Sequence, residues 1–307
     1  MEPLRLVDIW QDPDEPPFHT VAGLLTEALA AAARGFVARE QGLSARRDEE
    51  DLHQARVALR RIRSYLRTFR SVVDPVWASA VRAELGWYGG LLGDVRNFDV
   101  MEGRISELAN KSEDLVGYKE LLAAVDAARA GAFGRLAESH ELPRYQSVLR
   151  HISALANKDV RLGVGASEEA ACACRRIIRR PYRSVRDAAK IARRTPSETQ
   201  LHVLRIRSKE LRYASEITAE IFGKPASRLA RAAQGVQDRL GEHRDALATA
   251  AFARHAAIEH PVGAYAAGQL VTVERITAER CLDGLAADLN QLRGRWRDFE
   301  RATSTWS

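Results

Sequence analysis

Residues 53–67 read HQARVALRRIRSYLR, and residues 202–216 read HVLRIRSKELRYASE. At an offset of 149 positions the second stretch repeats the basic and apolar positions of the first. Both are rich in Leu, Arg and Ala and contain neither proline nor glycine, which favours a helix. The aligned pairs are His53 with His202, Arg56 with Arg205, Val57 with Ile206, Arg60 with Lys209, Ile62 with Leu211, and Arg63 with Arg212.

Helical spacing places the cations of each stretch on one face. Positions 0, 3, 7 and 10 of a helix fall within an arc of about 80° at roughly 100° per residue. Apolar residues such as Leu59, Ile62 and Leu211 lie on the opposite side, where a core is expected. The first stripe comprises His53, Arg56, Arg60, Arg63 and, one turn further, Arg67, and the second comprises His202, Arg205, Lys209 and Arg212.

Two further elements repeat in the same order. Arg34 and Arg183 each stand 19 residues before the histidine of their copy, and LGDVRN at 92–97 matches LGEHRD at 240–245 at an offset of 148. The second match aligns Arg96 with Arg244. Three repeated elements in one order indicate an internal duplication, with a first half over about 20–165 and a second over about 166–307.

Composition predicts an all-α protein of 307 residues. Four of the ten prolines fall within residues 1–17, and no run of alternating β-branched residues predicts a strand. Residues 1–18 are therefore expected to form an irregular, acidic lead-in to a domain over 19–307. The expected helices cover 20–41, 49–72, 75–92, 95–110, 115–139, 143–157, 168–194 with an interruption near Pro181, 198–222, 226–240, 243–257 and 262–302 with a break inside.

Other chemistry is not indicated. Cys172, Cys174 and Cys281 have neither disulfide-framework nor zinc spacing, so neither a metal nor a cofactor is expected. The apolar runs look too short for a membrane span, and the acidic N-terminus does not resemble a secretory signal. A cytoplasmic location is expected by default. The net charge of +6 permits an anionic partner without requiring one.

The first stripe carries positive charge that no acid of the same segment balances. Between His53 and Arg70 there are six arginines and no acid. Like charges one turn apart repel by a few tenths of a kcal/mol per pair, which an anionic ligand would relieve. Two simpler interpretations are open. The stripe is a solvated basic face, or it pairs with acids on neighbouring helices, for which the acids near the two glycines are the candidates: Asp94, Asp99, Glu242 and Asp245.

The HxxRVxxRRxRS stretch at 53–64, the HxLRIxxKxLRY stretch at 202–213 and the two LGxxR[ND] turns resemble the CHAD family, the conserved histidine α-helical domain. The resemblance runs from about residue 20 to the C-terminus. It implies two four-helix bundles related by a pseudo-two-fold axis, whose basic helices face each other across a central groove or pore that binds inorganic polyphosphate. Many such domains follow a CYTH-type domain, whose tunnel motif of alternating glutamates is missing here, so a stand-alone member is expected.

The resemblance implies polyphosphate contact for the residues of the two stripes, and the repeat adds four arginines to them. One departure is Glu210, which stands where the first copy has Arg61, so the two faces are not equally basic. Of the added arginines, Arg96 and Arg244 either bind ligand or fix the turns by pairing with Asp94 or Asp245. The candidate polyphosphate-binding residues are Arg34, His53, Arg56, Arg60, Arg63, Arg67, Arg96, Arg183, His202, Arg205, Lys209, Arg212 and Arg244.

A polyphosphate chain presents closely spaced charges without bases or apolar groups, and arginine can grip its oxygens with paired donors. Single-stranded nucleic acid is the leading alternative, but its binders interleave stacking aromatics with basic residues. Here Tyr65 and Phe69 point to the apolar side, and Tyr213 at the edge of the second stripe is the exception. A scaffold that docks an acidic protein or a storage granule is a third hypothesis.

Catalysis is not expected, because the stripes offer no carboxylates for a metal, no nucleophile beside a base and no Gly-rich phosphate loop. The segment from Arg175 to Arg194 carries nine cations against one acid. It either extends the groove or forms a separate docking surface, and the sequence leaves both open.

Overall fold

The computed structural model describes residues 18–45 and 49–305, so the predicted lead-in at 1–18 lies outside the described residues except for Phe18. The described part is helical throughout and contains no β-strand, only two isolated β-bridges. The predicted all-α class is confirmed. The helices are α1 (Val21–Ala45), α2 (Glu49–Thr68), α3 (Pro75–Ala109), α4 (Leu115–His140), α5 (Pro143–Ala156), α6 (Ala170–Arg194), α7 (Glu198–Phe222), α8 (Lys224–Glu259), the short 3-10 helix η2 (Pro261–Gly263), α9 (Ala264–Asp283) and α10 (Leu285–Ala302).

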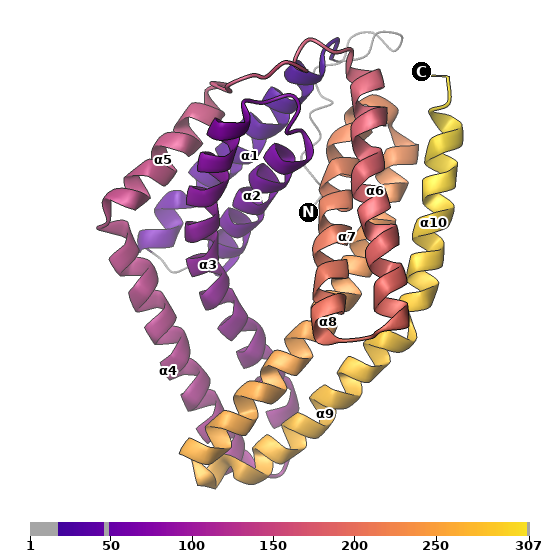
Figure 1. Cartoon of the computed structure of the whole chain (residues 1–307). Helices are drawn as coiled ribbons and strands as arrows, with labels where there is room; N and C mark the ends of the chain where they lie inside the picture. The colour runs from indigo at the N-terminus through magenta and orange to yellow at the C-terminus, as the bar shows by residue number, and fades with distance from the viewer. Residues whose placement is uncertain (1–17, 46–48, 306–307) are drawn as a thin grey trace.

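Three hydrophobic cores hold these helices together, and Figure 1 shows how the helices are arranged. The first joins α1, α2, α5 and the first part of α3, and it also takes in residues of α6 and α7 such as Ile177 and Tyr213. The second joins α6, α7, α10 and the first part of α8. The third lies at the far tip, where the ends of α3 and α8 meet α4 and α9. Because the first core reaches into α6 and α7, helices α2 and α7 are held against each other.

Three predicted helix breaks are wrong. Helix α3 runs unbroken through Gly93 and α8 through Gly241, so the LGxxR segments are not turns. A glycine inside a helix costs about 0.5–1 kcal/mol relative to alanine but does not end it when both flanks are packed. Helix α6 likewise continues through Pro181, whose ring is buried in the fold. By contrast, the break predicted inside 262–302 is found at Gly284, and α7 has the predicted bounds.

Helix α1 is apolar over most of its length. Its segment Val21–Glu40 is the one stretch among the described residues that is long and apolar enough to cross a membrane, a feature that the sequence prediction overlooked. Leu24, Leu25 and Leu29 of this segment are fully buried in the first core. The packed core therefore accounts for the apolar character of α1.

Candidate functional site

Helices α2 and α7, which carry the two predicted stripes, touch through a tyrosine and an arginine. Arg60 Nε of α2 donates a hydrogen bond of 2.6 Å to the hydroxyl of Tyr213 in α7. The rings of Tyr65 and Tyr213 meet edge to face at 6.4 Å between centroids, and Tyr213 is completely buried. Arg212 lies over the same ring, with its guanidinium carbon 5.4 Å from the centroid. The one aromatic at the edge of a stripe is therefore enclosed and presents no face for stacking.

Acids of α7 neutralise the C-terminal part of this contact. Glu210, only 9% exposed, is paired with Arg67 of α2 and, at 2.9 Å, with Arg207 of its own helix. Glu216 pairs with Arg212 at 2.7 Å and lies 3.6 Å from Arg61 of α2. The interpretation in which neighbouring acids neutralise the stripes thus holds at this end. It holds through acids of α7 itself rather than those near the glycines.

The centre of the contact is a different environment. Five cations meet there, and among the described residues none of the five forms an ion pair with a carboxylate. The Nε atoms of Arg63 and Arg205 are buried without any hydrogen-bond partner. We call this group the central cation cluster, and it consists of Arg56, Arg60 and Arg63 of α2 with Arg205 and Lys209 of α7.

Burial and mutual repulsion act on the central cation cluster together. Burial, followed by the charges of Arg60 and Arg205, lowers the pKa of Arg56 to about 10. The same two causes, burial first and then the charges of Arg60, Arg205, Arg56 and Arg63, lower the pKa of Lys209 to about 7. Such shifts mean that the fold disfavours the charged forms. A bound anion would favour them.

The two histidines and their neighbouring arginines flank the cluster at the N-terminal ends of α2 and α7. Burial, and then the charge of Arg96, lowers the pKa of His53, whose Nδ1 is buried without a hydrogen-bond partner. Burial, and then the charges of Arg244 and Arg205, lowers the pKa of His202. His202 and Arg244 are exposed, so this end of the cluster is open to solvent.

Asp245 of α8 is an acid close to the cluster, and the charge of Asp238 on the same helix also raises the pKa of Arg205. The charge of Asp245 raises the pKa of Arg56 and Arg205, although desolvation is the larger influence on both. Burial in turn raises the pKa of Asp245 itself. Two carboxylates cannot neutralise five cations, and burial disfavours the charged form of Asp245.

The structure also answers whether Arg96 and Arg244 fix turns. Arg96 lies 3.6 Å from Asp99 on the next turn of α3, and not against Asp94. Arg244 forms no ion pair among the described residues, and no turn exists beside either arginine. The turn-fixing interpretation is wrong, and ligand contact by these two arginines stays a prediction.

Two glycines leave space for guanidinium groups of the central cation cluster. A Cβ at Gly93 would lie 3.6 Å from Nε of Arg56, and one at Gly241 would lie 3.5 Å from Nε of Arg205. A third glycine, Gly86, is tighter, because its Cβ would lie 3.1 Å from the guanidinium of Arg63. The glycines of the LGxxR segments therefore let arginines of α2 and α7 lie flat against α3 and α8.

This packing predicts different outcomes for two substitutions of Gly241. Because 3.5 Å is an ordinary van der Waals contact, Gly241→Ala should keep anion binding and raise the free energy of unfolding by about 0.5–1 kcal/mol. Gly241→Leu should displace Arg205 and weaken binding of a phosphate polymer about tenfold. Thermal unfolding and fluorescence anisotropy measure the two effects. Equal binding by the alanine and leucine variants would contradict this account of the glycine.

Arg34 and Arg183 have their interactions outside the central cation cluster. Arg34 donates a hydrogen bond of 3.3 Å to the backbone oxygen of Ala156 in α5. Arg183 is exposed on α6, where its charge contributes to lowering the pKa of Asp187 one turn later. In the part of the chain that the structure describes, no hydrogen bond or ion pair joins either arginine to the cluster.

The sequence prediction missed Arg82 of α3. The charge of Arg82 lowers the pKa of Arg63. Burial and the charge of Arg67 lower the pKa of Arg82 itself, and its Nε is buried without a hydrogen-bond partner. Arg82 belongs neither to the stripes nor to the LGxxR segments, which are the elements that the prediction used.

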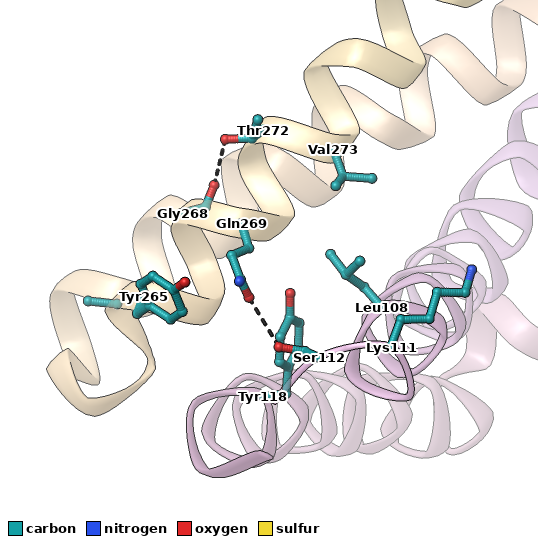
Figure 2. Close-up of a pocket in the computed structure, with 10 residues that line it drawn as sticks. Leu108, Lys111, Ser112, Tyr118, Tyr265, Gly268, Gln269, Thr272 and Val273 are labelled. Carbon is teal, nitrogen blue, oxygen red and sulfur yellow. Dashed lines mark hydrogen bonds between the residues drawn. The ribbon is translucent and has the colours of Figure 1, made fainter. Parts of the chain in front are cut away.

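A hollow of about 560 Å³ lies elsewhere in the described structure, at the tip between α3, α4 and α9 (Figure 2). It is lined by Tyr118 and Tyr265, by Gln269, which accepts a hydrogen bond of 3.2 Å from Ser112, and by Lys111 as its single cation. This hollow has no part in the cation cluster. In the described residues, no three His, Cys, Asp or Glu side chains are grouped to hold a metal ion.

The fold and the cluster define a class of protein: an all-helical domain in which two helices bring unneutralised cations together. A family model for the CHAD domain matches residues 27–254, and the chain belongs to this family. Two solved structures share the fold. The chain is 22% identical to PptA from Streptomyces chartreusis, with a TM-score of 0.72 over 88% of this chain and 99% of that one. It is also 22% identical to the CHAD domain from the plant Ricinus communis, with a TM-score of 0.71 over 90% and 92%.

Two curated relatives come from Mycobacterium tuberculosis, uncharacterized protein MT2285 of strain CDC 1551 and uncharacterized protein Rv2226 of strain H37Rv. Each is 30% identical over 257 residues, a match that covers 78% of this chain and 48% of the relative. The chain thus spans about half the length of the curated relatives it matches.

Proposed function

We propose that this protein binds inorganic polyphosphate, without turning it over, through the central cation cluster and the two histidines beside it. The observation that carries the proposal is that five half-buried cations meet without a carboxylate ion-pair partner among the described residues, so that a bound anion would relieve their mutual repulsion. Arginine supplies several donors to phosphate oxygens, and lysine supplies a point charge. Family membership supports the same ligand.

We also propose that the cluster was built by duplication. Support comes from equivalent contacts in the two halves: Gly93 of α3 packs on Arg56 of α2, and Gly241 of α8 packs on Arg205 of α7. Each half thus supplies one basic helix and one glycine-bearing helix to a shared groove. The two halves differ at Glu210, which ties the helices together where an exact repeat would place another cation.

Nucleic acid is the second candidate, because it satisfies the same electrostatics. The burial of Tyr213 and Tyr65 favours polyphosphate, since binding of unpaired bases depends on exposed aromatic faces. Polyphosphate has no bases and loses nothing when these rings are enclosed.

A competition experiment separates the two ligands. At moderate salt, long-chain polyphosphate is expected to displace labelled single-stranded RNA, and RNA is expected to displace labelled polyphosphate poorly. Binding should weaken steeply as salt rises, because counterions are released from the polyanion. Preference for RNA would overturn the proposal.

The absence of turnover and the location are further parts of the proposal. The groups that gather in the cluster are guanidinium, ammonium and imidazole, which bind phosphate, and among the described residues no three His, Cys, Asp or Glu side chains are grouped to hold a metal ion that would activate a water. We therefore expect no release of orthophosphate from long chains. A cytoplasmic protein at polyphosphate or storage granules would use the cluster in the same way, because a granule presents the polyanion in bulk.

A further inference from the structure

Helix α6 carries a basic face that the central cation cluster does not use. Its cations are exposed, whereas Ile178, Val185 and Ala188 on the opposite side are buried in the second core. The face covers 15 residues from first to last, and the 14 helical steps between them extend for about 21 Å along the helix axis. We call this surface the α6 basic face, and it consists of Arg180, Arg183, Arg186, Lys190, Arg193 and Arg194.

The α6 basic face is almost unneutralised. Asp187 is the only acid of the helix, and it pairs with Arg186 at 3.0 Å. Among the described residues, the other five members of the face form no ion pair or hydrogen bond. At the N-terminal end of α6 the situation differs, because Arg176 is paired with Glu168 and Arg179 lies 3.9 Å from Glu300. The charge left without partners is thus concentrated in the C-terminal half of the helix.

That half leads to the open end of the central cation cluster. Only Thr195, Pro196 and Ser197 separate Arg194 from the first residue of α7. A chain of that length spans at most about 14 Å between Cα atoms, and the exposed His202 follows one turn later. Helices α6 and α7 pack side by side and are joined at this end (Figure 1).

We propose that a long polyphosphate chain leaves the central cation cluster past His202 and continues along the α6 basic face. This inference rests on the proposed function and adds a second contact surface for the same ligand. The complementary charge of the face fits a linear polyanion, and cations about one turn apart can follow it without a groove. Long chains would then bind more tightly than short ones, because one molecule meets both surfaces.

Two other occupants fit the face less well. A face that binds a membrane would present several exposed apolar residues beside its cations. Ile191 is the one large apolar residue of α6 that is exposed. Unpaired nucleic acid bases would need a free aromatic face, but Tyr182 is stacked on Trp296 of α10 at 4.0 Å. The face offers charge alone.

The test compares two ligand lengths on one variant, Lys190→Glu with Arg194→Glu. Affinity for long-chain polyphosphate is expected to fall about tenfold, and the salt dependence of binding should become shallower by about one to two units of slope. Affinity for tripolyphosphate, which fits within the cluster, is expected to stay within about twofold.

The matched control is Arg228→Glu with Arg231→Glu, which makes the same change in net charge on exposed residues at the start of α8. Because α7 separates that site from the open end by its full length, both ligands should bind the control as they bind the unmodified protein. Circular dichroism verifies that both variants keep their helix content. An unchanged affinity for long chains, an equal loss for both lengths, or an equal loss in the control would each overturn the inference. Failure of the unmodified protein to bind either ligand would overturn the proposed function itself.

Discussion

Reversing the charge of Arg56 and Arg205 together, as Arg56→Glu with Arg205→Glu, is expected to weaken polyphosphate binding by at least about a hundredfold. The two guanidinium groups lie close enough for the charge of Arg205 to lower the pKa of Arg56. Each substitution removes a charge-assisted hydrogen bond, worth about 1.5–3 kcal/mol, and places a carboxylate where the ligand must lie. Fluorescence anisotropy with labelled long-chain polyphosphate at moderate salt measures the loss.

The same variant should not be less stable than the unmodified protein. Its two acids would pair with cations that now repel one another, such as Arg60 and Lys209, so the thermal midpoint is expected to stay equal or rise. The Arg228→Glu with Arg231→Glu variant again controls for net charge. Affinity retained within about threefold, in a variant with unchanged helix content, would show that the two helices do not share one site.

The pattern of the sequence was sufficient for the class of the fold and for most helix boundaries. Helix α7 begins and ends at the predicted residues, because its apolar side fixes the period while Ser197 caps its start and Gly223, at φ 57°, ends it. Gly93, Gly241 and Pro181 were misleading, because local propensity treats them as breaks. Their helices continue since packing on both flanks outweighs a local cost of about 1 kcal/mol for glycine and about 3 kcal/mol for proline.

The site was predicted in part for a similar reason. Helical spacing is local, so it correctly grouped Arg56, Arg60 and Arg63 on one face. Neutralisation is not local: Arg67 meets Glu210, which is 143 residues away, and only the crossing of α2 and α7 brings them together. Sequence spacing contains no information on that crossing, and it therefore counted Arg67 as free.

The glycines are the clearest case of a signal seen but misread. Their repetition in both halves was visible in the sequence and suggested turns. In the structure they lie on helices and make room for guanidinium groups, Gly93 for Arg56 and Gly241 for Arg205. A repeated glycine near a repeated arginine thus indicates close packing as readily as a turn.

The same enclosure that positions the cations makes their charge depend on pH, and Lys209 shows this most clearly. Burial and the charges of Arg60, Arg205, Arg56 and Arg63 place its pKa at about 7 in the free protein, so it is largely neutral at pH 8. A bound polyanion favours the charged form and raises that pKa. The contribution of Lys209 to affinity should therefore be constant below about pH 7 and fall as pH rises between the pKa values of the free and the bound protein, by up to about tenfold per pH unit.

The two histidines also make affinity fall as pH rises, but in a lower pH range than Lys209. Burial and neighbouring arginines lower the pKa of His53 and of His202, so both are largely neutral near pH 7 and would gain protons when phosphate binds. Calorimetry in two buffers of different ionisation enthalpy should detect proton uptake on binding at pH 8. Lys209→Arg should remove the fall in affinity above pH 7, because arginine stays charged, while the dependence below pH 7 remains with the histidines. An affinity that does not change between pH 7 and 9, or a profile that Lys209→Arg leaves unaltered, would mean that Lys209 does not contact the ligand.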